Sequence, residues 1–446
     1  MDDTIVAIST AVGVGAISII RVSGESAISI VNKIFDKELT KANSHTIHYG
    51  HIIDNNEIID EVLVTVMLKP KTFTVEDVVE INTHGGIATT NRVLELLILN
   101  GCRLAEPGEF TKRAFLNGRI DLLEAEGVMN LIEAKSDISR NLALKQLNGE
   151  VSNNIKELKN KILKILANIA VNIDYPEYED ILELTTENIK EEINIIELKL
   201  NEILKQSKNS TIVLDGLKTV ILGRPNVGKS SILNLLLNEE KAIVTDVAGT
   251  TRDIVEGNLN LNGVYLKLLD TAGIHKTSDK VEEIGINKSL KLIKEAELIL
   301  LVLDNSEALT KEDLELLELT KNKNRIIIIN KIDLENKLKI NEENVIYLSA
   351  IKKEGIKELR NKIVEMFNLE SINTDMNMFV NASNIAKIKK CINLIKKIKE
   401  GIKNNILIDM IEIDLKEINE ILGSVIGESY DEEILDTIFK NFCLGK

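Results

Sequence analysis

The segment at residues 223–230, which reads GRPNVGKS, constrains the fold more than any other part of the sequence. It follows a short apolar run at residues 220–222 and precedes residues 231–237, which suit a helix. Glycines in such a segment let backbone N–H groups close around phosphates, and the loop needs a strand before it and a helix after it. The sequence therefore predicts a phosphate-binding loop in an α/β domain.

Further motifs follow this loop, each after its own apolar run. DTAG stands at residues 270–273, NKID at residues 330–333, and Ser349 with Ala350 follows the run at residues 345–348. The carboxylate of Asp333 can accept both guanine donors, N1–H and the exocyclic amine, whereas adenine lacks this pair and would leave the carboxylate unpaired. Order and spacing together predict a GTP site.

Each motif supplies its own contact to the nucleotide. Lys229 is expected at the β and γ phosphates, Ser230 at Mg²⁺ with Asp270 in the outer shell, and the Gly273 amide at the γ phosphate. The loop TDVAGTTRD at residues 245–253 adds threonine hydroxyls, and chemistry alone leaves open which one completes the Mg²⁺ shell. The residues expected to bind GTP are Asn226, Val227, Gly228, Lys229, Ser230, Ser231, Thr245, Asp246, Val247, Ala248, Gly249, Thr250, Thr251, Asp270, Thr271, Ala272, Gly273, Asn330, Lys331, Asp333, Ser349 and Ala350.

The position after DTAG departs from Ras-type enzymes, which place a glutamine there to orient the attacking water. This chain has Ile274, which cannot hydrogen-bond a water, and no isolated arginine stands out as a finger. Glu282 is the candidate for the catalytic, water-orienting group. From the residues alone, a solvated charge on a switch helix is the simpler interpretation of Glu282.

Apolar spacing divides the chain into regions. Short strands, as at residues 62–68 and 78–83, alternate with helices such as 91–99 in the first region, and helical stripes with spacings of three and four flank the α/β segment on both sides. We expect one helical domain interrupted by a doubly wound α/β domain. The predicted domains are an α+β domain at 1–117, a helical part at 118–212, a P-loop GTPase domain at 213–370 and a second helical part at 371–446.

Composition limits the partners and the compartment. The net charge of −15 shows no basic surface, so any RNA contact is expected to be local, weak or shared with a partner. Cys102, Cys391 and Cys443 form no CxxC pair, which excludes an evident zinc knuckle and fits a reducing cytoplasm. No stretch reaches the length of a membrane span. We predict a cytoplasmic protein without a membrane partner.

Several motifs together give the chain a family resemblance. HGG at residues 84–86, PGEFTKRAFLNGRIDL at 107–122 and FCLGK at 442–446 accompany the GTPase motifs. In this order they resemble the tRNA-modification GTPase family called MnmE or TrmE, over essentially the whole chain. The resemblance implies a tetrahydrofolate-binding N-terminal domain, a homodimer, and a heterotetramer with an MnmG (GidA)-like flavoprotein that carries the FAD.

The same resemblance implies the reaction and its cofactors. Members modify the wobble uridine of certain tRNAs at carbon 5 with an aminomethyl or carboxymethylaminomethyl group. The one-carbon unit comes from 5-formyl- or methylene-tetrahydrofolate. GTP hydrolysis is activated by K⁺, which replaces an arginine finger and promotes pairing of two GTPase domains, and it drives a conformational change.

Residue roles carry over at matching positions. The implied K⁺ ligands are the Asn226 side chain and groups at Thr245, Val247 and Thr250, while Thr251 would join Ser230 at Mg²⁺. Glu282 matches the water-orienting glutamate of the family, which moves it ahead of the simpler interpretation. The implied folate-binding residues are Arg21, Glu80, Arg119 and Lys446. Arg119 departs from the lysine of better-known relatives, and Cys443 is either a group near the one-carbon unit or a small buried side chain.

Two other classes of function compete with this one. A ribosome-assembly GTPase of the Era type shares the GTPase motifs but usually adds a basic RNA-binding domain, which this acidic chain lacks. A regulatory switch would bind GTP and hold a partner without chemistry. Co-sedimentation with ribosomal subunits would support the first, and unchanged hydrolysis in a Glu282→Ala variant would favour the second.

Overall fold

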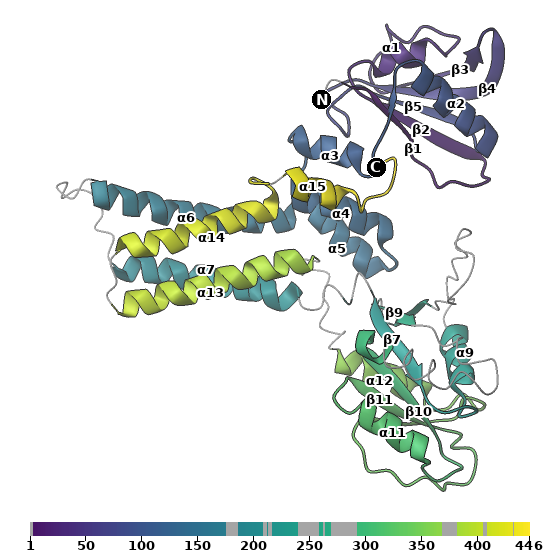
Figure 1. The fold of residues 1–446 in the computed structure, drawn as a ribbon, viewed down its shortest axis with the longest axis vertical. Helices are drawn as coiled ribbons and strands as arrows, with labels where there is room; N and C mark the ends of the chain where they lie inside the picture. The colour runs from purple at the N-terminus through teal and green to yellow at the C-terminus, as the bar shows by residue number, and fades with distance from the viewer. Residues whose placement is uncertain are drawn as a thin grey trace. The chain divides into compact units, whose positions relative to one another are not determined.

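The computed structural model describes residues 3–174, 186–207, 212, 216–239, 258–261, 264–268, 292–367, 381–404, 408–430 and 432–446 (Figure 1). The chain forms two compact units. One comprises Met1–Ile132, Lys145–Glu197 and Lys390–Lys446, and the other comprises Glu133–Leu144 and Leu198–Lys389. Each unit has apolar cores of its own.

The first unit begins with a six-stranded sheet in the order β3-β4-β5-β2-β1-β6, antiparallel except where β1 meets β6. Val6 faces the core beneath α1 and α2, whereas Ile5 and Ala7 pack with Phe110 of α3, because successive strand residues face opposite sides. The elements are β1 (Ile5–Ile8), β2 (Ile17–Ser23), α1 (Ala27–Asn32), β3 (Thr46–Asp54), β4 (Glu57–Met67), β5 (Val78–His84), α2 (Ile87–Leu99), β6 (Arg103–Leu104) and α3 (Glu109–Leu116). The strand expected at 78–83 is confirmed. The strand expected at 62–68 and the helix expected at 91–99 are present but begin earlier, at Glu57 and Ile87, and the strand ends at Met67.

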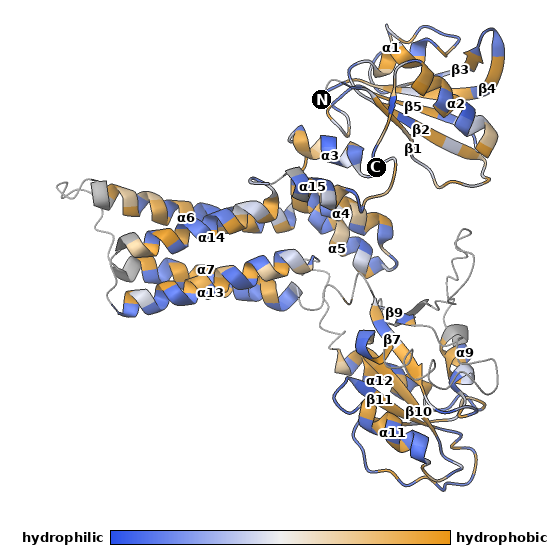
Figure 2. Cartoon of the chain, in the orientation of Figure 1, coloured by the Kyte–Doolittle hydropathy of each residue, from blue (hydrophilic) through white to orange (hydrophobic). Residues whose placement is uncertain are grey.

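Long amphipathic helices follow, with blue and orange faces in Figure 2. They are α4 (Leu122–Glu133), α5 (Asp137–Leu147), α6 (Glu150–Asp174), α7 (Thr186–Ser207), α13 (Ala382–Lys403), α14 (Ile408–Ile426) and α15 (Glu432–Phe439). The apolar stripe from residue 144 to 169 spans two helices, which are separated by Gly149 in the left-handed region at φ +79.

Helices from either side of the α/β segment pack together, as the sequence predicts. α6 lies against α14, and Lys159 of α6 forms an ion pair with Glu428 just beyond α14. Lys399 of α13 lies 2.7 Å from the carboxylate of Glu197 on α7. The helical part is therefore assembled from two stretches of chain that are far apart in sequence.

The second unit contains a six-stranded sheet in the order β12-β11-β10-β7-β9-β8, parallel except for β8 with β9. Residues of β10 alternate between two cores, one shared with α9 and α12 and the other with α11, so helices cover both faces. The central strands are accordingly orange in Figure 2. The elements are β7 (Leu217–Leu222), α9 (Lys229–Glu239), β8 (Asn258–Leu261), β9 (Val264–Leu268), β10 (Leu298–Asp304), α11 (Lys311–Leu319), β11 (Arg325–Asn330), β12 (Val345–Leu348) and α12 (Ile356–Met366).

This architecture confirms a multidomain chain of α/β and α parts. The described residues of the predicted apolar runs lie in strands of the sheet, and residue 269, the end of one run, is outside the described part. The short antiparallel β8 was not foreseen. Among the helices of the described residues, none is long and apolar enough to cross a membrane.

Candidate functional site

The phosphate loop connects the end of β7 to the start of α9. Gly223, Asn226 and Gly228 adopt positive φ values of 147, 65 and 100 degrees, which turn the loop tightly. A Cβ atom on Gly228 would lie 2.2 Å from Nδ2 of Asn330, so only glycine fits where the loop touches the end of β11. The predicted strand, loop and helix are thus present in that order.

Lys229 opens α9 with its side chain drawn back over the loop. Its Nζ donates hydrogen bonds to the carbonyls of Gly223 and Arg224, each at 2.7 Å. Lys229 as a whole is only 7% exposed, and burial lowers the pKa of its amine. An ammonium group held within a loop of backbone amides is the arrangement that binds the phosphates of a nucleotide. Ser230 follows it in the first turn of α9.

Asn330, at the end of β11, ties the loops of the site together. Its Nδ2 donates to the Val227 carbonyl at 2.8 Å, and its Oδ1 accepts from the Ala350 amide at 3.2 Å. The side chain is buried, so these hydrogen bonds replace its contacts with water. The phosphate loop, NKID and the Ser349–Ala350 turn therefore meet at one edge of the sheet, as their order predicts.

Asp333 is held in its charged form beside this junction. Its Oδ1 accepts a hydrogen bond from the Ser349 hydroxyl at 2.5 Å, and that bond lowers the pKa of the carboxyl group. An ionised carboxylate can accept both guanine donors. The Ser349 hydroxyl also accepts from the Lys352 amide at 3.2 Å, which fixes its position.

Part of the predicted nucleotide site lies outside the described residues. Of the expected K⁺ ligands the described part includes Asn226, and of the Mg²⁺ ligands it includes Ser230. The predicted residues outside it are Thr245, Asp246, Val247, Ala248, Gly249, Thr250, Thr251, Asp270, Thr271, Ala272, Gly273 and Glu282.

The predicted folate residues Arg21, Glu80 and Lys446 come together around the C-terminal tail. Arg21 and Glu80 are partners across β2 and β5, with Nε 2.8 Å from Oε1. Arg21 also donates to the Gly445 carbonyl at 3.2 Å, and the Ser9 hydroxyl donates to the same oxygen at 3.1 Å. Burial, and then the charge of Arg21, lower the pKa of the neighbouring Lys446 amine. Two cations and one carboxylate thus share this site.

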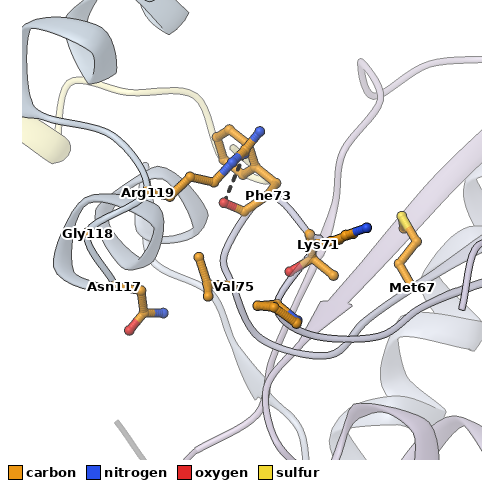
Figure 3. Close-up of a pocket in the computed structure, with 9 residues that line it drawn as sticks. Met67, Lys71, Phe73, Val75, Asn117, Gly118 and Arg119 are labelled. Atoms are coloured by element: carbon orange, nitrogen blue, oxygen red, sulfur yellow. Dashed lines mark hydrogen bonds between the residues drawn. The ribbon is translucent and has the colours of Figure 1, made fainter.

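Arg119 is placed elsewhere. Its guanidinium lies 5.0 Å from the centre of the Phe73 ring and donates to the Phe73 carbonyl at 3.0 Å. With Lys71 and Asn117 it lines an open pocket of about 650 Å³, shown in Figure 3. The structure does not bring Arg119 into contact with the other predicted folate residues. Cys443 is exposed, which contradicts its interpretation as a small buried side chain.

Sequence reasoning missed a buried carboxylate at the nucleotide edge. Asp304 ends β10, is 4% exposed, and lies 2.5 Å from the amine of Lys331 in NKID. The available signal was its position, because polar residues at the carboxyl ends of parallel strands gather at one edge of such a sheet.

Comparisons with known proteins show the family to which the chain is related. Residues 4–119 match the family described as GTP-binding protein TrmE N-terminus, and residues 122–443 match the MnmE helical domain. The tRNA modification GTPase MnmE of Streptococcus thermophilus is 50% identical over 100% of this chain and 98% of its own. That of Ligilactobacillus salivarius is also 50% identical, with the same coverage. A crystal structure of Era with MgGDPNP and 16S ribosomal RNA nucleotides is 30% identical over 33% of this chain and 56% of its own, at a TM-score of 0.26. The chain belongs to the family of tRNA modification GTPases named MnmE.

Proposed function

We propose that this chain binds and hydrolyses GTP as an enzyme of tRNA modification. The observation that carries the proposal is the junction at Asn330, which joins the phosphate loop, NKID and the turn at Ala350. Beside it stands the ionised Asp333, whose two oxygens suit the paired donors of guanine. The family relationship over the full length of the chain supplies the tRNA context.

We propose further that hydrolysis depends on K⁺ and Mg²⁺. Asn226, exposed and in the left-handed region, offers an amide oxygen of the kind that hard cations take. Thr245, Val247 and Thr250 would complete the K⁺ shell, and Ser230 with Thr251 would hold Mg²⁺. A fixed cation can stabilise the transition-state charge that an arginine finger stabilises in other enzymes. Glu282 would orient the attacking water in place of the glutamine that Ile274 replaces.

Hydrolysis rates in KCl and NaCl at equal ionic strength test the cation. We expect faster turnover in KCl, with equal rates counting against K⁺ activation. Glu282→Ala tests the water-orienting role, with the adjacent Glu283→Ala as the matched control. Loss of a group that acts on the attacking water costs about 100-fold or more in kcat. We expect this loss in Glu282→Ala alone, with GTP affinity retained in both variants.

The second part of the proposal concerns the modification reaction. We propose that the chain acts as a homodimer with an MnmG (GidA)-like flavoprotein that carries FAD, and that together they modify the wobble uridine of tRNA at carbon 5. A tetrahydrofolate derivative would supply the one-carbon unit at Arg21, Glu80 and Lys446. The Glu80 carboxylate can accept hydrogen bonds from the N–H donors of a pterin. The neighbouring cations of Arg21 and Lys446 suit the carboxylates of a glutamate tail. Arg119 would reach the folate from its own pocket.

Calorimetry with 5-formyl-tetrahydrofolate tests this site directly. Arg21→Ala should weaken binding by about tenfold or more, the size expected when a charge-assisted hydrogen bond is lost. Arg92→Ala is the control, because Arg92 belongs to the same unit and is likewise ion-paired, with Asp54 at 2.5 Å. Equal affinities in the two variants would argue against a folate at Arg21.

A further inference from the structure

The corner at the end of β10 contacts two loops of the proposed nucleotide site. One is the phosphate loop, and the other is the segment NKID at residues 330–333, which we call the base loop. The corner comprises residues 304–307, which read DNSE, and we name it the β10 corner. None of the nucleotide motifs includes it. Its two carboxylates, Asp304 and Glu307, each pair with a cation of a different nucleotide loop.

Asp304 holds the base loop. Its Oδ2 lies 2.5 Å from Nζ of Lys331, and its Oδ1 accepts from both the amide and the hydroxyl of Ser306, at 2.9 and 2.7 Å. Burial opposes the charged form, but these hydrogen bonds from Lys331 and Ser306 still lower the pKa of Asp304. Lys331 itself sits at φ +66, a strained conformation for a residue with a side chain. The ion pair therefore restrains a backbone conformation that would otherwise relax.

Backbone hydrogen bonds extend the same connection. The Asn305 amide donates to the Asn330 carbonyl at 2.9 Å, and the Asn305 carbonyl accepts from the amides of Lys337 and Leu338 at 2.9 and 3.3 Å. Asn305 is buried. The β10 corner is thus attached both to NKID itself and to the chain that follows it, and a shift of one would move the other.

Glu307 holds the phosphate loop through Arg224. Glu307 Oε2 lies 2.5 Å from Nη2 of Arg224, and Asp313 Oδ2 lies 3.4 Å from its Nε. Asp313 is fixed in turn by the capping box that it forms with Thr310 at the start of α11. The carbonyl of Arg224 accepts the hydrogen bond from Lys229. The guanidinium therefore anchors the residue that holds the phosphate-binding amine.

We propose that the β10 corner is a positioning element of the nucleotide site, with Asp304 ordering the base loop through Lys331 and Glu307 ordering the phosphate loop through Arg224. This inference rests on the proposed GTP site. When a loop is already ordered before the nucleotide binds, binding does not have to supply the entropic cost of ordering it. The β10 corner should therefore raise the affinity for the nucleotide. Because Asp304 reaches the base loop and not the reacting phosphate, its loss should raise KM and leave kcat unchanged.

The test uses the full chain and three variants: Asp304→Asn, Glu307→Gln and, as the control, Glu312→Gln on the exposed side of α11. Affinity is measured with N-methylanthraniloyl-GDP, and KM and kcat with GTP. Asp304→Asn should raise Kd and KM about tenfold with kcat unchanged, as expected for one lost charge-assisted hydrogen bond. Glu307→Gln should raise Kd about threefold, because its pair with Arg224 is partly exposed. The control should match the wild type.

A milder variant covers the case in which Asp304→Asn does not fold. Ser306→Ala removes the hydroxyl that donates to Asp304, and it should raise Kd about twofold to threefold. A wild type that does not hydrolyse GTP would refute the proposed function. A wild type that hydrolyses GTP, with every β10-corner variant matching the Glu312→Gln control in Kd and KM, would refute the positioning role alone.

Discussion

At the scale of single residues, the proposed nucleotide site is built from a few fixed groups. Asp333 is ionised beside Ser349, and Asn330 joins the loops around it. These residues could be predicted, because the base chemistry demands a carboxylate after a strand. The position of Asp304 at a strand end was a signal that it belongs to this edge, but its pairing with Lys331 could not be predicted. Lys331 follows β11, and spacing along the chain does not show which strand ends are neighbours. The pair of Arg21 and Glu80 likewise depends on the register of β2 with β5.

Asp333→Asn tests the base specificity. The amide replaces one acceptor by a donor, so guanine loses a partner, whereas xanthine offers a carbonyl at the position of the guanine amine. We expect GTP affinity to fall about 100-fold or more, because two hydrogen bonds to a charged group are affected. The affinities for GTP and XTP are measured by competition of each nucleotide against a fluorescent nucleotide. An unchanged preference for GTP would show that Asp333 does not contact the base.

His84 carries a pH prediction for the N-terminal sheet. Its Nδ1 lies 2.7 Å from Oδ1 of the buried Asp60, and this hydrogen bond raises the pKa of His84 above 6.5. A histidine whose pKa is higher in the folded state than in the unfolded state stabilises the fold. This contribution is complete below the pKa of the unfolded state and is lost as the pH rises through the pKa of the folded state. The difference in melting temperature between wild type and His84→Gln should therefore be larger at about pH 6 than at about pH 9. A constant difference would contradict the ion pair.

At the scale of elements, periodicity identified the buried strands and the long helices. It missed β8, whose four residues NLNL alternate over too short a stretch to stand out, and it did not show the break between α5 and α6. The apolar stripe keeps its phase across that break because Leu147 and Val151 are four residues apart, as within one helix. The left-handed Gly149 between them is visible only in the structure.

Two glycines of the helical part should respond oppositely to alanine. At Gly149, φ is +79, so Gly149→Ala should destabilise the fold by about 1 kcal/mol or more. Gly423, inside α14, has its nearest neighbour 3.4 Å from an added Cβ atom. There, alanine should stabilise the helix by up to about 1 kcal/mol. Urea unfolding measures the change in the free energy of unfolding for each variant. A change of the same sign in both variants would contradict the helix break at Gly149.

At the scale of the whole molecule, a GTP-binding α/β segment interrupts a set of helices that pack across the interruption. The net charge of −15 gives no sign of a broad basic surface for RNA phosphates. The proposed tRNA chemistry would therefore rely on a partner for much of its RNA contact. Which parts would meet in the proposed dimer and with the proposed flavoprotein depends on surfaces that periodicity does not encode.

Mass spectrometry of wobble nucleosides, from cells that lack this protein, tests the central claim most directly. The cells are complemented with the wild-type chain or with Lys229→Ala, which removes the buried amine of the phosphate loop. We predict that the carbon-5 aminomethyl-type groups of wobble uridine disappear without the protein, return with the wild type, and stay absent with Lys229→Ala. A nucleoside profile that is the same with and without the protein would contradict the account.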